Sequence, residues 1–193
     1  MIERPKEPQP IPAHAQKVFS GIIYDVFHWE QKLFDGSTTT FEKLRRPDTV
    51  IVIPTLSDKQ LVVIDEQQPG SDPIVTFPAG RVESGEDVES AARRELLEET
   101  GYSPGELILW KALQPSSLID WAVYVFIARG CSITAPLQLD PGEKITVRTI
   151  PFDEALRLIK NPKFQNTNIG IEFTEALYDT DARRELEKLL FEE

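Results

Sequence analysis

Short apolar runs with a two-residue period dominate the first quarter of this chain, and they predict β-structure. Lys17–Lys32 and Ser37–Arg46 alternate in this way and are joined at Asp35-Gly36, a strong signal for a β-hairpin turn. Both faces of the first strand carry bulky apolar groups. Because an isolated hairpin is only marginally stable, we expect this N-terminal antiparallel β-hairpin to pack on another surface.

After Pro47-Asp48 the pattern predicts strands followed by a small number of helices. The predicted strands are Thr49–Ile53, Gln60–Asp65, Ile74–Phe77, Glu106–Leu113, Trp121–Ala128 and Lys144–Ile150. The predicted helices are Glu86–Thr100, Phe152–Ile159, about Ile169–Tyr178 and Asp181–Phe191. This order favours an α+β fold with a mixed sheet covered on both faces. We therefore divide the chain into a Pro-rich tail and hairpin (1–46) and a second domain (47–193).

Composition narrows the class of protein. The chain has 193 residues, enough for a core that needs no disulfide or zinc, and Cys131 is its single cysteine. Met1–Pro12 is rich in proline and charge, which indicates a mobile tail rather than a secretory signal. No apolar run approaches the ~20 residues that span a bilayer. We expect a cytoplasmic protein that does not bind membranes.

The charge is strongly and unevenly negative. The formal net charge is −11; residues 1–46 contribute seven basic and six acidic groups, whereas residues 47–193 contribute 14 and 26. A chain this acidic repels a nucleic-acid backbone, and no basic stripe offsets the repulsion, so we expect no nucleic-acid partner. Acidic groups concentrate between Glu83 and Glu106, where they form either a solvated face or a cation site.

Three carboxylates share one side of the first predicted helix. At 100° per residue, Glu95, Glu98 and Glu99 fall within an arc of about 100°. Their mutual repulsion works against the helix unless a counter-ion binds. Hard divalent cations such as Mg²⁺ take oxygen ligands and bridge to phosphates, which makes a catalytic metal site one interpretation. A solvated acidic face, with Arg93 and Arg94 as partners, is the other.

The same segment resembles the Nudix box, G-x5-E-x7-R-E-U-x-E-E-x-G-U, in which U is a bulky apolar residue. Every specified position is filled, by Gly80, Glu86, Arg94, Glu95, Leu96, Glu98, Glu99, Gly101 and Tyr102. The resemblance implies a Nudix-type α/β/α sandwich over residues 47–193 and a hydrolase that splits a phosphoanhydride in a nucleoside diphosphate linked to another moiety. It also implies Mg²⁺ as cofactor, with Mn²⁺ as a substitute, in two or three ions.

The resemblance implies roles for particular residues. Glu95, Glu98, Glu99 and the Ala79 carbonyl are implied as metal ligands, and Arg94 as the side chain that orients a neighbouring glutamate. Glu98, Glu99, Arg94 and Glu143 are the candidate catalytic residues. Glu143 fits the position of a general base or late metal ligand, and a polar loop residue beside Pro141-Gly142 is the equal alternative.

Three further segments resemble the ADP-ribose and nucleotide-sugar pyrophosphatase branch: Leu33-Phe34-Asp35-Gly36, Glu66-Gln67 and Pro78-Ala79-Gly80. In that branch the hairpin helps to build a homodimer and reaches the partner's nucleotide. Phe27 and Trp29 are accordingly candidates to stack on a base, with ordinary packing as the alternative for each.

The sequence departs from this branch where phosphate-binding arginines are usual. Gln68-Pro69 follows Glu66-Gln67 where relatives have an arginine, and Trp121 stands where an acid is frequent. The candidate replacements for substrate binding are Arg45, Arg46 and Arg81. A nucleoside triphosphate, coenzyme A or a dinucleotide polyphosphate remain alternative substrates, and a non-catalytic nucleotide-binding module is the alternative function.

Overall fold

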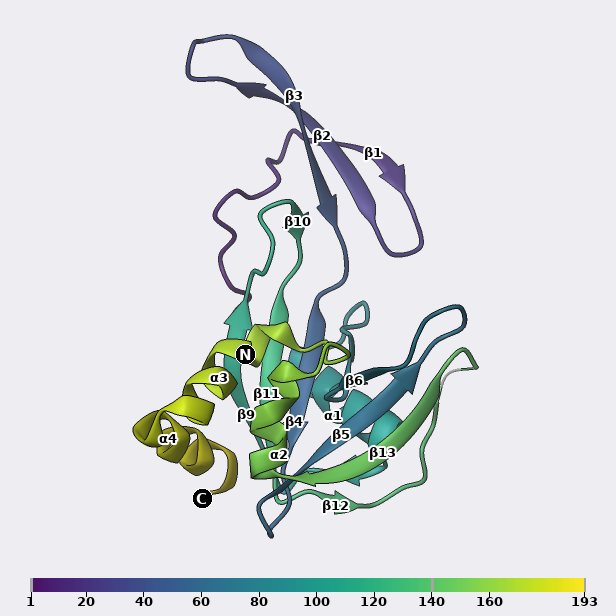
Figure 1. Ribbon diagram of the computed structural model, residues 1–193. Coiled ribbons are helices and arrows are strands. Elements are labelled where there is room, and N and C mark those ends of the chain that lie inside the picture. Colours follow the sequence, from purple (N-terminus) through teal and green to yellow (C-terminus); the bar gives the residue numbers. More distant parts are fainter. Residues whose placement is uncertain (1, 140, 193) are drawn as a thin grey trace.

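A computed structural model of the chain describes residues 2–139 and 141–192. It has two parts: a body of strands and helices, and a long strand pair that projects from it (Figure 1). The projecting part contains β1 (Gln16–Ser20), β2 (Asp25–Lys32) and β3 (Thr38–Arg45), and the order of its sheet is β1-β2-β3-β10. The expected hairpin is therefore present as β2 and β3.

The prediction of one strand over Lys17–Lys32 is wrong, because the chain reverses inside it. β1 pairs antiparallel with β2, and the turn is closed by a hydrogen bond from the Gly21 amide to the Tyr24 carbonyl (2.9 Å). Gly21 permits this turn, since a Cβ at that position would meet the Phe19 ring at 2.9 Å and the Tyr24 carbonyl oxygen at 3.0 Å. The apolar alternation continues through the turn and conceals it.

Residues 2–15 contain no strand, but ion pairs connect them to the rest of the chain. Arg4 donates to both carboxylate oxygens of Asp48, at 2.8 and 2.9 Å, and pairs with Asp120 at 2.8 Å. Glu7 pairs with Lys43, and both of these side chains are buried. These ion pairs give the Pro-rich segment defined contacts with β3, Asp48 and Asp120, and its mobility stays a prediction.

The body contains two sheets, which are built mostly from the predicted strands. One has the order β7-β4-β11-β9 and the other β13-β5-β6. β4 and β11 pair in parallel while the remaining pairs in these two sheets are antiparallel, so the arrangement is mixed as expected. The strands are β4 (Thr49–Pro54), β5 (Gln60–Gln67), β6 (Ile74–Thr76), β7 (Ala79–Arg81), β9 (Glu106–Leu113), β11 (Val123–Arg129) and β13 (Lys144–Pro151).

Four short strands were not predicted. Three are two-residue strands that depend on pairing with distant segments: β8 (Tyr102–Ser103) pairs with β12 (Ser132–Ile133), and β10 (Ile119–Asp120) pairs with β3. The fourth is β7, which resumes extended structure directly after Pro78 and pairs with β4. Local sequence carries little information about strands that exist only through their partners.

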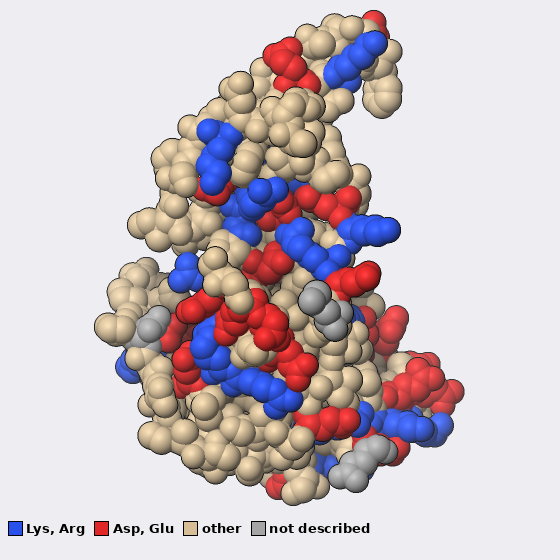
Figure 2. Space-filling model, turned by 180° about the vertical axis from the view of Figure 1, so that it is seen from behind, with Lys and Arg blue, Asp and Glu red and all other residues tan. Residues whose placement is uncertain are grey.

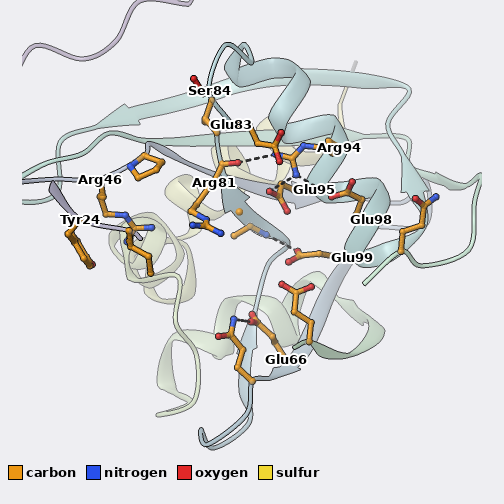
Figure 3. A pocket seen from close by; sticks show the side chains of 18 residues that line it. Tyr24, Arg46, Glu66, Arg81, Glu83, Ser84, Arg94, Glu95, Glu98 and Glu99 are labelled. Atoms are coloured by element: carbon orange, nitrogen blue, oxygen red, sulfur yellow. Dashed lines mark hydrogen bonds and ion pairs between the residues drawn. The ribbon is translucent and has the colours of Figure 1, made fainter. Parts of the chain in front are cut away.

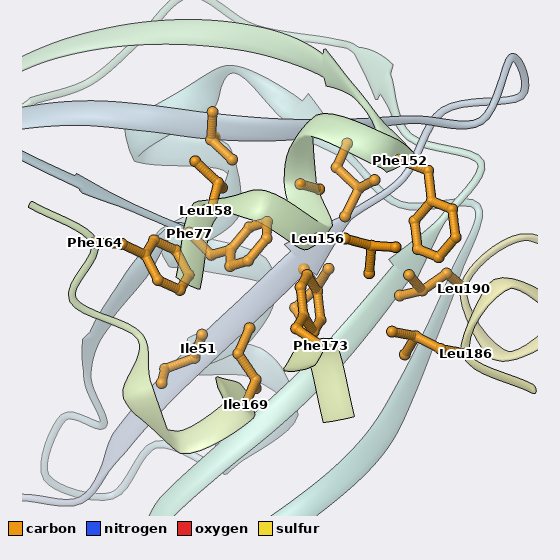
Figure 4. Packing of buried hydrophobic residues seen from close by; sticks show 14 of the residues in the cluster. Ile51, Phe77, Phe152, Leu156, Leu158, Phe164, Ile169, Phe173, Leu186 and Leu190 are labelled. Carbon is orange, nitrogen blue, oxygen red and sulfur yellow. The ribbon is translucent and has the colours of Figure 1, made fainter. Parts of the chain in front are cut away.

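Helices cover both sides of the central strands, which gives the expected α/β/α sandwich (Figure 1). α1 (Val88–Thr100) lies on one side, against Val50 and Val52 of β4. On the other side, Ile51 and Ile53 of β4 join the larger core with α2 (Phe152–Arg157), α3 (Gly170–Tyr178) and α4 (Thr180–Phe191) (Figure 4). Two 3₁₀ turns, Leu158–Lys160 and Thr167–Ile169, connect these helices. Successive residues of one strand thus face opposite layers.

Over the described residues, no helix is both long and apolar enough to cross a membrane.

Candidate active site

Capping residues fix where α1 begins and ends. Asp87 caps the N-terminus by accepting hydrogen bonds from the amides of Glu89 (3.1 Å) and Ser90 (3.0 Å), so the helix starts two residues later than predicted. Gly101 ends it in the left-handed conformation, with φ of 74°, as its position in the sequence predicts. A Cβ at Gly101 would also lie 2.4 Å from the Ala135 carbonyl oxygen, so two constraints favour glycine here.

Glu99 lies at the base of the site and is nearly inaccessible to solvent. Its relative exposure is 5%, and one carboxylate oxygen accepts a 3.0 Å hydrogen bond from the Ala79 amide of β7. Burial raises its pKa to about 9; the charges of Glu95, Glu66 and Glu143 add to this effect, and the Ala79 amide opposes it. A carboxyl under such repulsion is a favourable place for a cation.

Glu95 lies directly over the backbone of β7. A Cβ built at Gly80 would lie 2.0 Å from the carboxyl carbon of Glu95, so the absence of a side chain at Gly80 makes room for this carboxylate. Burial raises the pKa of Glu95, while its ion pair with Arg94 acts in the opposite direction. The glycine of the box is therefore a spatial requirement of the acidic cluster, because α1 and β7 approach each other closely here.

Arg94 connects four groups around the cluster. Its guanidinium donates to both oxygens of Glu86 (2.9 Å each), to Glu95 (2.8 Å), to Glu98 (3.2 Å) and to the Arg81 carbonyl (3.0 Å). These charge-assisted bonds raise the pKa of Arg94, and the bond from Arg94 is the main reason that the pKa of Glu86 is lowered. Arg94 thereby fixes the positions of Glu95 and Glu98.

A cavity of about 900 Å³ opens beside these carboxylates (Figure 3). Glu95 and Glu99 point into it from α1, and Glu66 approaches from the end of β5. Glu143, from the loop before β13, also lines it. The predicted metal and catalytic residues Ala79, Arg94, Glu95, Glu98, Glu99 and Glu143 are therefore brought together around one cavity.

The predicted substrate-binding residues fall into two groups. Arg46 and Arg81 line the cavity. Arg45 instead pairs with Asp120 at 2.6 Å, and its guanidinium lies 4.8 Å from the centre of the Phe27 ring. Phe27 and Trp29 are buried within the hairpin, at 9% and 6% exposure, and do not line the cavity.

Charges of both signs surround the cavity. On the face drawn in Figure 2, acidic side chains gather over the body with some basic ones among them, and basic side chains lie beside acidic ones where the hairpin joins the body. In the close view, Tyr24 and Arg46 lie at the end of the cavity opposite Glu98 and Glu99, with Arg81 between the two ends (Figure 3). This arrangement suits an anion that binds cations at one end and arginine at the other.

The donor set fits magnesium or manganese. It consists of carboxylate oxygens, which hard divalent cations prefer. Burial raises the pKa values of Glu95 and Glu99, and neighbouring carboxylates add to this effect. Among the described residues, no three acidic, histidine or cysteine side chains form a ready-made metal cage. Mg²⁺ does not require one, because it commonly keeps several waters and uses one or two carboxylates together with substrate phosphates.

Sequence reasoning did not assign site roles to Glu66, Tyr24 or Gln138, which also line the cavity. Glu66 could have been found from the sequence, since it lies two residues after the buried run Leu61–Ile64 of β5; in the structure Gln68 donates to it at 2.9 Å. Tyr24 lies in the unpredicted turn between β1 and β2. No local pattern marks Gln138. Its position depends on a hydrogen bond from its backbone amide to the Glu98 carbonyl oxygen (2.8 Å).

Comparison with known proteins agrees with this geometry. The sequence model of the NUDIX domain matches residues 45–169, so the chain belongs to the Nudix family, and the box marks it as a Nudix hydrolase. It is 30% identical over 149 residues to the ADP-ribose pyrophosphatase of Bacillus subtilis (strain 168), a match that covers 76% of this chain and 80% of that protein.

Two further similarities broaden the comparison. The Methanol dehydrogenase activator of Bacillus methanolicus is 30% identical over 160 residues, covering 81% of this chain and 86% of the relative. A crystal structure of an ADP compounds hydrolase superposes with a TM-score of 0.73 at 22% identity, covering 95% of this chain and 97% of the other. The expected fold, and the resemblance to the ADP-ribose pyrophosphatase branch of the family, are thereby confirmed.

Proposed function

We propose that this protein is a magnesium-dependent pyrophosphohydrolase of ADP-ribose or a related nucleoside diphosphate sugar. Its products would be a nucleoside monophosphate and a sugar phosphate. The observation that carries the proposal is the convergence of Glu95, Glu98 and Glu99 on one cavity, facing Glu66 and Glu143 from other strands and loops. The similarity to the ADP-ribose pyrophosphatase of Bacillus subtilis supports this choice of substrate class.

In this proposal the carboxylates of Glu95, Glu98 and Glu99 and the carbonyl oxygen of Ala79 hold two or three Mg²⁺ ions, for which Mn²⁺ can substitute. When bound, such ions neutralise the diphosphate and favour deprotonation of water. Arg94 holds Glu95 and Glu98 in place through the bonds described above.

Proton transfer requires a carboxylate that can approach the attacking water. Glu98 and Glu143 are the candidates for this general base, because both line the cavity and neither is as enclosed as Glu99. Glu143 lies on the loop that precedes β13, a place from which a catalytic group can approach a bound substrate.

We assign substrate recognition to the end of the cavity that carries Arg46 and Arg81. Arg46 and Arg81 are positioned to bind the phosphate farther from the carboxylates, since both line that part of the cavity. The sequence-based hypothesis that Arg45, Phe27 and Trp29 contact the base of a substrate would require a rearrangement of the hairpin, because Phe27 and Trp29 are buried in it and Arg45 pairs with Asp120.

We further propose that residues 1–46 and 47–193 are functional units, with the hairpin forming a homodimer. The hairpin carries exposed apolar side chains, which favour association in water. These are Val18 (49% exposed), Phe19 (60%), Ile22 (98%), Ile23 (44%), Leu33 (37%) and Phe34 (113%). Sedimentation analysis of Phe19→Asp tests this: the variant should be monomeric where the parent is dimeric, and a monomeric parent would refute the dimer.

The test of activity is a turnover panel with Mg²⁺ that includes ADP-ribose, other nucleotide sugars, a nucleoside triphosphate, coenzyme A and a dinucleotide polyphosphate. Relatives named for different activities are similarly distant, so the panel has to extend beyond ADP-ribose. Glu98→Gln and Glu99→Gln should each reduce turnover by at least ~10²-fold, the usual scale for a lost catalytic group. The matched control is Glu89→Gln, on the same helix, where the side chain is exposed and pairs with Arg93 (3.0 Å).

Equal turnover by the parent, Glu98→Gln and Glu99→Gln would refute the proposal. Binding of a nucleotide without any product across the panel would instead favour a non-catalytic binding module.

A further inference from the structure

Arg46 is held differently from the arginines near it. Arg45 pairs with the Asp120 carboxylate at 2.6 Å, and Arg94 pairs with three glutamates. Within residues 2–139 and 141–192, no carboxylate forms an ion pair with the guanidinium of Arg46. Because Arg46 also lines the cavity, it brings an uncompensated positive charge to the proposed substrate site.

Two aromatic rings lie close to the guanidinium of Arg46. The guanidinium carbon of Arg46 lies 4.7 Å from the centre of the Trp121 ring and 5.9 Å from that of Tyr24. The hydrogen bond from its side chain to the Thr49 hydroxyl is a long one of 3.5 Å, and its Nε is buried without an acceptor among the described residues. Most of the five N–H groups of the Arg46 side chain therefore have no partner in the part of the chain that the structure describes.

Trp121 is held in place by a hydrogen bond and by apolar packing. Its indole N–H donates to the Thr49 hydroxyl at 2.9 Å, and its ring packs against the larger apolar core. Trp121 does not line the cavity, so it contacts Arg46 from the protein side. Stacking on an aromatic face holds a guanidinium in a plane while leaving its edge N–H groups available to an anion.

We propose that Trp121 is a positioning residue that directs Arg46 into the cavity and leaves its charge available for the substrate. Arg46 then binds the phosphate that lies farther from the carboxylates. An acid at position 121 would instead pair with Arg46 and cancel its charge. This inference rests on the proposed function, because it assumes a nucleoside diphosphate in the cavity.

The test compares Trp121→Glu, Trp121→Phe, Trp121→Ala and Arg46→Ala with the parent. Each is assayed for kcat and KM with ADP-ribose and Mg²⁺, and for the Kd of ADP by calorimetry. Trp121→Glu should raise KM and Kd about tenfold, the loss expected for one charge-assisted hydrogen bond, with kcat little changed. Trp121→Phe should recover most of the affinity that Trp121→Ala loses, since it restores an aromatic face.

A control for added charge comes from the neighbouring loop. Leu118→Glu introduces the same carboxylate at a side chain that is 71% exposed, and it should leave the Kd of ADP as in the parent. The decisive comparison is the double variant Trp121→Ala/Arg46→Ala, which should bind ADP no more weakly than Arg46→Ala because both changes remove the same interaction without adding a charge.

Losses that add in the double variant, or a parental Kd in Trp121→Glu, would overturn the inference. If circular dichroism shows that Trp121→Glu is unfolded, Trp121→Ala takes its place in the comparison with the parent. A parent that releases no product from ADP-ribose refutes the proposed substrate, and the Kd of ADP then decides the inference by itself. A parent that binds no ADP refutes both.

Discussion

In the metal-free protein, the Glu99 carboxyl gives the free energy of unfolding a pH dependence of definite sign. Its pKa is about 9 in the folded chain, against an ordinary value of 4.5, because it is buried among other carboxylates. Between these two pH values the folded state binds one proton more than the unfolded state. The free energy of unfolding therefore falls as pH rises through this window, and the stabilisation is fully present only below about 4.5.

The expected size follows from the linkage relation. Each pH unit within the window lowers the stability by ~1.4 kcal/mol, so raising the pH from 6 to 8 costs about 3 kcal/mol through this one group. Glu99→Gln has no proton to lose, and its stability should change correspondingly less over the same range. Glu89→Gln, an exposed substitution on the same helix, should retain the parental dependence.

Urea denaturation in EDTA, followed by tryptophan fluorescence at pH 6, 7 and 8, measures these differences. Added Mg²⁺ should restore stability most at pH 8, where the carboxylate is most readily ionised and an ion that binds the folded state shifts the equilibrium toward it. If the stability difference between the parent and Glu99→Gln is the same at pH 6 and pH 8 in EDTA, the reasoning from burial and repulsion is wrong.

Three further predictions concern packing. Gly80→Ala should displace the flexible Glu95 carboxylate, which a Cβ would meet at 2.0 Å, and so reduce turnover by at least ~10-fold with a loss of stability below about 1 kcal/mol, measured by kinetics and thermal melting. Gly101→Ala should lower the free energy of unfolding by about 1–3 kcal/mol, because φ is 74° and the Ala135 carbonyl leaves no room for a Cβ; an unchanged urea midpoint would contradict this. Phe173→Ala should cost about 3–5 kcal/mol by urea denaturation, since its ring is fully buried; a loss below about 1 kcal/mol would refute the assignment of Phe173 to the core.

The acidic helix could be predicted from sequence because its determinants are local. A 3.6-residue period places Glu95 and Glu99 on one side, and Gly101 ends the helix through its own backbone conformation. The box spacing then identified the family, which the match over residues 45–169 confirms. The strand β4 was likewise predictable as a short run of Val and Ile, whereas its division between two layers was shown by the structure.

The turn at Gly21–Tyr24 could not be predicted from the sequence pattern. An alternating pattern specifies which face each side chain occupies but not where a strand reverses, so β1 and β2 looked like one strand. The short strand β10 exists only through its pairing with β3, which lies about 75 residues earlier in the chain. Such contacts are decided by the packing of complete elements.

By itself, the sequence determined the family, the helix that carries the acidic residues and the presence of the central apolar strands, because these depend on the residues of one segment. Only the tertiary structure decided that Glu66 faces this helix across a cavity and that Gly80 makes room for Glu95. It also decided that Arg46, rather than Arg45, lies in the cavity, with Trp121 behind it. These are relations between segments distant in the chain, and they arise from close packing, burial and charge in three dimensions.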